Sequence, residues 1–232
     1  MPMERLILFD IDGTLTRTVN GHLPFNQAIF KTFGAAGDIR SVIPDGNTDP
    51  QILREIFLKA KLELTLRNGT LERFARILCD AYTDALRAGS TTICALPGAL
   101  ALLEALSAEK DFNQSVVTGN FELTAQVKLE AAGLHKYLHR GGYASDSHHR
   151  PELPRIAKER WERRSGKSLR AEQCVIIGDT PNDLDAARQN HMKCVLVGTG
   201  RYPVEELAYW EPDSCLPDLT DTLAVVSTLS SL

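Results

Sequence analysis

Four short apolar runs constrain the fold of this chain more than any other feature of its sequence. They lie at residues 6–9, 115–117, 174–177 and 194–197. Each run is largely apolar rather than alternating, which is typical of strands buried on both faces in a parallel sheet. Apolar residues at helical spacing separate the last three runs. This alternation predicts an α/β fold with a doubly wound parallel sheet and right-handed crossovers.

The stretch between the first two runs has a different character. It contains three segments with apolar residues at helical spacing and no strand-like run. We therefore predict that residues 15–95 form a helical subdomain inserted into an α/β core made of residues 1–14 and 96–232. A Leu-Pro-Gly turn signal beginning at Leu96 marks the return to the core. A helical layer packed on the sheet is the alternative.

Charge and composition argue against several classes of partner. The 26 Lys and Arg against 30 Asp and Glu give a net charge of −4, whereas nucleic-acid backbones attract basic surfaces. No apolar run approaches the ~20 residues of a membrane-spanning helix, and the N-terminus lacks a secretory cleavage site. The five cysteines include no Cys-x-x-Cys pair, which favours a reducing compartment. We expect a cytoplasmic protein without nucleic-acid or membrane partners.

Polar residues follow three of the four runs, at the point where each strand would end. The first run is followed by Asp-Ile-Asp-Gly-Thr at 10–14, the second by Thr-Gly-Asn at 118–120, and the third by Gly-Asp-Thr-Pro-Asn-Asp at 178–183. In open parallel sheets, ligands bind beyond the carboxyl ends of the strands. The sequence therefore predicts one site built from these three segments.

The carboxylates of these segments indicate a cation. Asp10 and Asp12 are two residues apart, so extended backbone directs both to one side, where they repel unless a cation or proton intervenes. Asp179 adds a third carboxylate, and this set suits Mg²⁺, which takes one or two protein carboxylates together with a substrate phosphate. Solvated loop acids are the alternative. Asp183 has a structural alternative of its own, since Thr180-x-x-Asp183 resembles a capping box.

The segment after the second run is suited to an anion. Thr118, Gly119 and Asn120 lie before a predicted helix, and backbone N–H groups at a helix start, with a hydroxyl beside them, bind phosphate. Asn120 is alternatively a plain N-cap residue.

Together, these segments resemble the motifs of the haloacid dehalogenase superfamily, in its phosphatase branch. Residues 10–16, Asp-Ile-Asp-Gly-Thr-Leu-Thr, match the first motif, Thr118 matches the hydroxyl of the second, and residues 178–183 match the fourth. The helical insertion is similar to the small cap domain of phosphoglycolate phosphatase-like and β-phosphoglucomutase-like members. The resemblance covers nearly the whole chain.

The resemblance implies roles for the aspartates. Asp10 would be the nucleophile that forms an aspartyl-phosphate, and Asp12 would protonate the leaving alkoxide and then activate water. Asp10, the backbone carbonyl of Asp12, and Asp179 would hold Mg²⁺, with Asp183 nearby.

The resemblance also implies a phosphate-binding role for the second strand end. Thr118 and the Gly119 amide would bind the phosphoryl oxygens, with Asn120 beside them.

The third motif departs from the commonest pattern of the family. It usually presents Lys followed by Pro at the start of a helix, whereas this chain has Arg150 followed by Pro. Either cation neutralises nucleophile and phosphate, although Arg is planar and forked where Lys is a point charge. Arg150 is the preferred candidate, with Lys158 and Lys128 as alternatives.

A turn at residues 44–49 separates two helices of the predicted insertion. In cap-bearing relatives a loop at this place reaches toward the substrate, so Asn47 and Thr48 are candidates for specificity. The alternative is a plain turn that caps the next helix.

The function that the resemblance implies is a Mg²⁺-dependent phosphatase acting on a small phosphorylated metabolite. A β-phosphoglucomutase-like phosphoryl mutase is the alternative within the enzymes, and a catalytically idle binding or regulatory module is the alternative outside them. The sequence indicates neither the substrate nor the oligomeric state.

Overall fold

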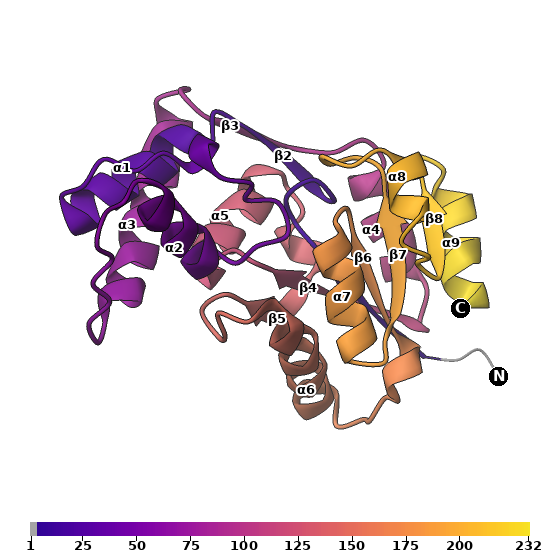
Figure 1. The fold of residues 1–232 in the computed structure, drawn as a ribbon. Coiled ribbons are helices and arrows are strands. Elements are labelled where there is room, and N and C mark those ends of the chain that lie inside the picture. Colours follow the sequence, from indigo (N-terminus) through magenta and orange to yellow (C-terminus); the bar gives the residue numbers. More distant parts are fainter. Residues whose placement is uncertain (1–3) are drawn as a thin grey trace.

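The computed structural model describes residues 4–232 and has a six-stranded parallel sheet at its centre. The strand order is β5-β4-β1-β6-β7-β8, with β1 in the middle, and Figure 1 shows helices on both faces of the sheet. The strands are β1 (Arg5–Phe9), β4 (Phe112–Thr118), β5 (His139–Tyr143), β6 (Cys174–Gly178), β7 (Lys193–Val197) and β8 (Ser214–Leu216). The expected doubly wound parallel sheet is confirmed, and each of the four apolar runs lies in a strand.

Alternate residues of each inner strand pack into different clusters, as the pleat requires. Ile7 and Phe9 of β1 belong to a core with α4 (Ala99–Ala108), α5 (Glu122–Ala131) and α9 (Thr222–Ser231). Leu6 and Leu8 belong to a second core on the opposite face.

The second core contains α6 (Leu153–Ser165), α7 (Pro181–Gln189) and α8 (Val204–Ala208). Both faces of the inner strands are thus covered, which explains why their sequences are largely apolar rather than alternating. Short 3₁₀ segments complete the structure at Ile39–Ser41, His135–Tyr137, Arg150–Glu152 and Ala171–Gln173.

The insertion forms a helical layer at one end of the sheet (Figure 1). Its helices are α1 (His22–Phe33), α2 (Asp49–Lys59) and α3 (Thr70–Arg87), which share a third hydrophobic cluster. That cluster also contains Phe121 of the α/β core, whose ring centroid lies 6.0 Å from that of Phe74. The insertion is therefore packed against the edge of the sheet where the predicted site lies.

Two strands connect the insertion to the core, and the expectation that no strand would occur in this stretch is wrong. β2 (Thr16–Val19) pairs antiparallel with β3 (Thr92–Ala95), so the chain leaves and re-enters the core through one two-stranded ribbon. Both strands are short and partly exposed, and all three helices of the insertion lie between them in the sequence. No local hairpin signal exists for such a pair.

None of the helices within residues 4–232 is long and apolar enough to cross a membrane.

Candidate active site

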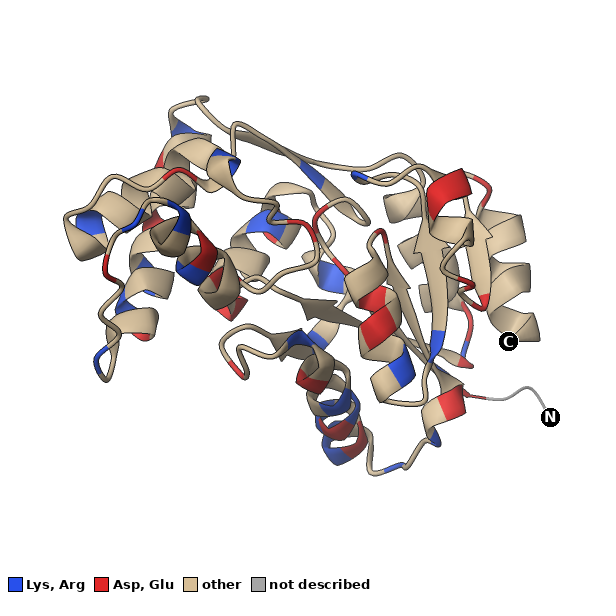
Figure 2. Ribbon diagram, viewed as in Figure 1, with Lys and Arg blue, Asp and Glu red and all other residues tan. Residues whose placement is uncertain are grey.

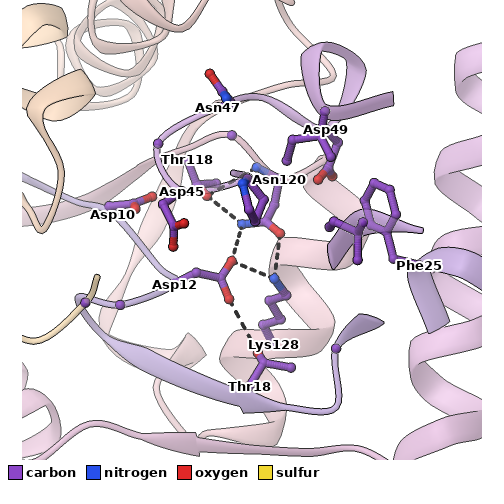
Figure 3. Close-up of a pocket in the computed structure, with 18 of the residues that line it drawn as sticks. Asp10, Asp12, Thr18, Phe25, Asp45, Asn47, Asp49, Thr118, Asn120 and Lys128 are labelled. Atoms are coloured by element: carbon purple, nitrogen blue, oxygen red, sulfur yellow. Dashed lines mark hydrogen bonds and ion pairs between the residues drawn. The ribbon is translucent and has the colours of Figure 1, made fainter. Parts of the chain in front are cut away.

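A cavity of about 580 Å³ lies between the carboxyl edge of the sheet and the insertion. Strand-end residues that line it include Asp10, Asp12, Thr118 and Asp179, and Arg150 lines it as well. Phe25, Ile52 and Leu78 of the helical layer form an apolar wall. Figure 3 shows Asp10, Asp12, Thr118 and Asn120 around the same space. The three predicted segments are thus brought together at one site.

Asp10 lies at the end of β1 and is buried, with 5% of its surface exposed. Its backbone N–H donates to the Ile177 carbonyl oxygen of β6 at 2.9 Å, which fixes its place between two strands. Arg150 Nη2 lies 3.3 Å from Asp10 Oδ1. Burial raises the pKa of Asp10 to about 7, with Asp183 and Asp12 adding to the shift and Arg150 opposing it.

Asp10, Asp179 and Asp183 form a buried cluster in which one carboxylate oxygen from each lies within 4.8 Å of the others. Burial, and then the charges of Asp10 and Asp183, raise the pKa of Asp179 well above its usual value. Arg150 contacts two of these three carboxylates, and one guanidinium does not balance three negative charges, which favours a further cation. Carboxylate oxygens at this spacing fit a hard divalent ion such as Mg²⁺.

Glycines shape the wall around Asp179. Gly13 has φ +83°, and a Cβ there would lie 2.4 Å from Asp179 Oδ2. A Cβ on Gly200 would lie 1.7 Å from the same oxygen. The hydroxyl of Thr14 donates to Asp179 Oδ1 at 3.0 Å. Side chains at the two glycines would displace the carboxylate, so the Gly of the first motif is required by close approach.

Asp183 combines the two roles left open by the sequence. The Thr180 N–H and hydroxyl donate to Asp183 Oδ2 at 3.1 and 2.7 Å, which is the capping interaction expected at the start of α7. Its other oxygen, Oδ1, accepts from Arg150 Nη2 at 2.5 Å. Asp183 therefore orients Arg150 as well as adding to the acidic cluster.

Of the three cations considered for the third motif, Arg150 contacts Asp10. Lys158 instead pairs with Glu162 on α6, a helix along which Figure 2 shows many charges of both signs. Lys128 pairs with Asp12. Arg150 begins a 3₁₀ turn and α6 starts at Leu153, so in this chain a 3₁₀ turn separates the arginine from the α-helix that follows it.

Asp12 points to a different set of partners from Asp10. Its Oδ2 accepts from Lys128 Nζ at 2.6 Å and from Asn120 Nδ2 at 2.8 Å, and its Oδ1 accepts from the Thr18 hydroxyl at 3.4 Å (Figure 3). Burial works to raise the pKa of Asp12, but the charge of Lys128 and these hydrogen bonds bring it below the usual value. Sequence analysis did not pair Lys128 with Asp12.

The second strand end is held by its own side chains. Asn120 Nδ2 donates to Thr118 Oγ1 at 2.8 Å, and both residues line the cavity. The alternative of Asn120 as the N-cap of α5 is wrong, because Phe121 occupies that position and the helix begins at Glu122. A Cβ on Gly119 would lie 2.0 Å from the Asn47 carbonyl oxygen, so this glycine allows the turn of the insertion to pack directly on the strand end.

The turn of the insertion places its two candidates differently. Asn47 lines the cavity, and its Nδ2 donates to the Ile43 carbonyl oxygen at 3.2 Å. Thr48 is buried at the N-cap of α2, donates from its hydroxyl to the His148 carbonyl oxygen at 2.8 Å, and is not among the cavity-lining residues. For Thr48, the structure therefore shows the capping alternative.

Asp49 is a site residue that sequence analysis missed. It lines the cavity, is 6% exposed, and accepts from the Phe121 N–H at 2.8 Å. Burial raises its pKa to about 7, although the charge of Lys128 and the hydrogen bond from Phe121 oppose the shift. Its position before a proline resembled an ordinary turn, and no sequence signal marked its burial.

Comparison with known proteins shows the family of this chain. A family model for haloacid dehalogenase-like hydrolases matches residues 4–191. The chain belongs to the haloacid dehalogenase-like hydrolases, a family of enzymes, as its motifs indicated.

Relatives and solved structures agree over nearly the full length. The chain is 25% identical over 230 residues to pyrophosphatase PpaX of Listeria monocytogenes serotype 4a, covering 95% of each chain. It is 27% identical over 224 residues to PpaX of Listeria innocua serovar 6a, again covering 95% of each. A hydrolase from Pseudomonas syringae has a similar fold, with a TM-score of 0.68, 22% identity, and coverage of 97% of this chain and 98% of that one. A predicted phosphoglycolate phosphatase from Haemophilus somnus also has a similar fold. Its TM-score is 0.67 and its sequence identity 23%, with coverage of 96% of this chain and 98% of that one.

Proposed function

We propose that this protein is a phosphatase that hydrolyses a small phosphorylated metabolite through an aspartyl-phosphate at Asp10. The observation that carries the proposal is the buried Asp10 carboxylate, in contact with Arg150 and beside Asp179 and Asp183. Catalysis of phosphoryl transfer depends mainly on positioning and on charge stabilisation, and this cluster provides both. The relatives named as pyrophosphatases support the same chemistry at phosphorus.

The chemistry divides between two aspartates. A carboxylate oxygen of Asp10 attacks phosphorus while the bond from phosphorus to the leaving oxygen breaks. Asp12, whose lowered pKa leaves it ionised in the free enzyme, takes the proton of the bound phosphate monoanion and gives it to the leaving oxygen. Asp12 then takes a proton from the water that attacks phosphorus, and the bond from phosphorus to Asp10 breaks. Thr118 and the Gly119 N–H bind the phosphoryl oxygens during both steps.

We propose Mg²⁺ as the cofactor. Asp10 and Asp179 would hold it, together with the backbone carbonyl of Asp12. When bound, the ion neutralises the repulsion between the carboxylate nucleophile and the phosphate. Asp183, whose oxygens are bonded to Thr180 and Arg150, would complete the acidic surroundings of the ion.

We propose that the insertion, residues 15–95, acts as a cap over a core of residues 1–14 and 96–232. The cap supplies the apolar wall of the cavity and the turn that packs on Gly119. Such a cap excludes bulk water from the reacting phosphate and contacts the part of the substrate beyond it.

The experiment that tests this function is a phosphate-release assay over a panel of phosphorylated metabolites. It is run with Mg²⁺, and again with the metal removed by EDTA. We expect release from at least one ester, lost with EDTA and restored by added Mg²⁺. No release from any ester in the presence of Mg²⁺, by protein shown to be folded, would contradict the proposal. Analysis of the products separates hydrolysis from transfer to a second hydroxyl.

Mg²⁺ affinity is expected to rise with pH. Without metal, the pKa of Asp10 is raised to about 7, so a proton competes with the cation at pH 6 and has mostly left by pH 8. Because the ligand must be ionised, we expect the Kd for Mg²⁺ to fall about tenfold from pH 6 to pH 8, with proton release. Titration calorimetry in two buffers of different ionisation enthalpy measures both effects. A pH-independent Kd without proton release would contradict this assignment.

The two candidates in the cap turn are expected to respond differently to substitution. Thr48→Ala removes an N-cap and a buried hydrogen bond, so it should lower the free energy of unfolding by about 1–2 kcal/mol, measured in urea, while Thr48→Ser should lose less.

Asn47→Ala should lower kcat/KM for the best ester of the panel about fivefold and leave acetyl phosphate unchanged, because a cap residue contacts only the remote part of the substrate. Equal losses on both substrates would show that Asn47 supports the fold instead.

A further inference from the structure

A buried lysine under the cap is not used by the mechanism above. Lys128 lies on α5, and its side chain is 6% exposed. A buried ammonium group is costly unless its charge and its three N–H donors are satisfied. Its partners therefore indicate what it is for.

Two acceptors bind the ammonium group, and one of them is the proposed acid–base residue. Lys128 Nζ donates to Asp12 Oδ2 at 2.6 Å and to Asn120 Oδ1 at 2.8 Å. Asn120 Nδ2 donates to the same Asp12 oxygen at 2.8 Å and to Thr118 Oγ1 at 2.8 Å. Figure 3 shows these bonds as a closed ring of Asp12, Asn120 and Lys128 with Thr118 attached.

The two carboxylate oxygens of Asp12 differ in their hydrogen bonds. Oδ2 accepts two short hydrogen bonds, one of them charge-assisted, which fixes the plane of the carboxylate. Within residues 4–232, Oδ1 accepts from Thr18 alone, at 3.4 Å, a distance at which a hydrogen bond is weak. Oδ1 is therefore the oxygen left for proton exchange.

Residues of the cap close the other side of Lys128. Its Nζ lies 5.4 Å from the centroid of the Tyr82 ring, which comes from α3. Burial works to lower the pKa of Lys128, but the charges of Asp12, Tyr82 and Asp49 raise it above its usual value. The lysine thus stays charged at the boundary between core and cap.

We propose that Lys128 is a positioning residue for the acid–base carboxylate. It anchors Asp12 Oδ2 through the ring with Asn120, leaves Oδ1 for proton transfer, and ties this orientation to the phosphate-binding Thr118. The inference rests on the proposed phosphatase function. A direct phosphate ligand is the competing role for Lys128, but Arg150 is the cation that contacts Asp10, whereas Lys128 contacts Asp12.

The test compares Lys128→Met with the wild type on two substrates, the best alkyl phosphate of the panel and p-nitrophenyl phosphate. A misplaced Asp12 should hinder proton transfer to a poor leaving group and matter little for a good one. We expect kcat for the alkyl ester to fall about 10- to 100-fold, with KM and the aryl ester each changed less than about threefold. Lys193→Met is the matched control: Lys193 begins β7, pairs with Asp213 at 2.8 Å and does not line the cavity, so its replacement should leave both substrates unchanged.

A double-mutant cycle identifies the residue through which Lys128 acts. In an Asp12→Ala background, Lys128→Met should cause no further loss on the alkyl ester. If Lys128→Met does not fold, Lys128→Arg keeps the buried charge, and the same difference between substrates is expected at smaller size.

Three results would overturn the positioning role: equal loss on both substrates, a raised KM with unchanged kcat, or an additive loss in the double variant. A Lys128→Met enzyme as fast as the wild type, with Asp12→Ala impaired, would refute this inference alone. A wild type without phosphatase activity would refute the proposed function, and the inference with it.

Discussion

Replacing Asp10 with Asn is expected to abolish turnover, with kcat lowered about 1000-fold or more. The amide keeps the shape of the side chain but is a poor nucleophile, and loss of a nucleophile commonly removes most of an enzyme's rate acceleration. Steady-state phosphate release with Mg²⁺ measures the loss. Asp185→Asn is the matched control, because Asp185 lies exposed on α7, accepts a hydrogen bond from Gln189 at 2.8 Å and does not line the cavity.

The same variant should remain folded, and its stability without metal should be higher than that of the wild type at pH 8. The folded pKa of Asp10, about 7, lies above its value of 3.8 in the unfolded chain, so folding favours the protonated form. The stability that this carboxyl contributes is therefore lost as pH rises from about 4 to 7. The Asp10→Asn variant avoids this loss of stability, because an amide does not ionise. A Tm below that of the wild type at pH 8 in EDTA would contradict this account, as would full activity with Mg²⁺.

Replacing Asp12 with Ala is the second large effect we expect, a fall of about 100-fold or more in kcat for an alkyl phosphate. The side chain is proposed to protonate the leaving oxygen, and a positioned general acid contributes rates of this order. For p-nitrophenyl phosphate the fall should be smaller, since its leaving group needs little protonation. The measurement that tests this role is the ratio of the fall in kcat on the alkyl ester to the fall in kcat on p-nitrophenyl phosphate, at saturating Mg²⁺.

An equal loss on both esters would contradict an acid–base role for Asp12. It would leave Asp12 as a residue that organises the metal site. The backbone carbonyl of Asp12 is unchanged in the variant, so Mg²⁺ affinity should change little, and calorimetry checks this independently of the rate.

The inner part of the sheet could be predicted from sequence because burial on both faces leaves a simple pattern. The runs that lie in β1, β4, β6 and β7 are largely apolar, and the polar residues that follow the first three of these strands meet at one edge. The outer strands lack that pattern. β5 reads His-Arg-Gly-Gly-Tyr, and β8 has three residues, all half-buried, so neither resembles a buried strand.

The parts of the site that could not be predicted depend on tertiary contacts. The partners of Lys128 and Asp49 come from segments distant in sequence, and periodicity does not show which buried polar groups will meet. A lysine on the buried face of α5, between Ala125 and Leu129, is the one signal that a partner was needed. The ambiguity at Thr48 also required the fold, since its hydroxyl bonds to His148 of another loop.

The central claim is that Asp10 carries the phosphoryl group between two chemical steps. Acid quenching of the wild type within the first turnovers of p-nitrophenyl phosphate tests it directly, because a good leaving group speeds formation of the intermediate over its hydrolysis. Mass spectrometry of the digest should show an alkali-labile phosphoryl adduct on the peptide that contains Asp10, absent from Asp10→Asn. An active enzyme with no adduct, or with the phosphoryl group on another residue, would contradict the account.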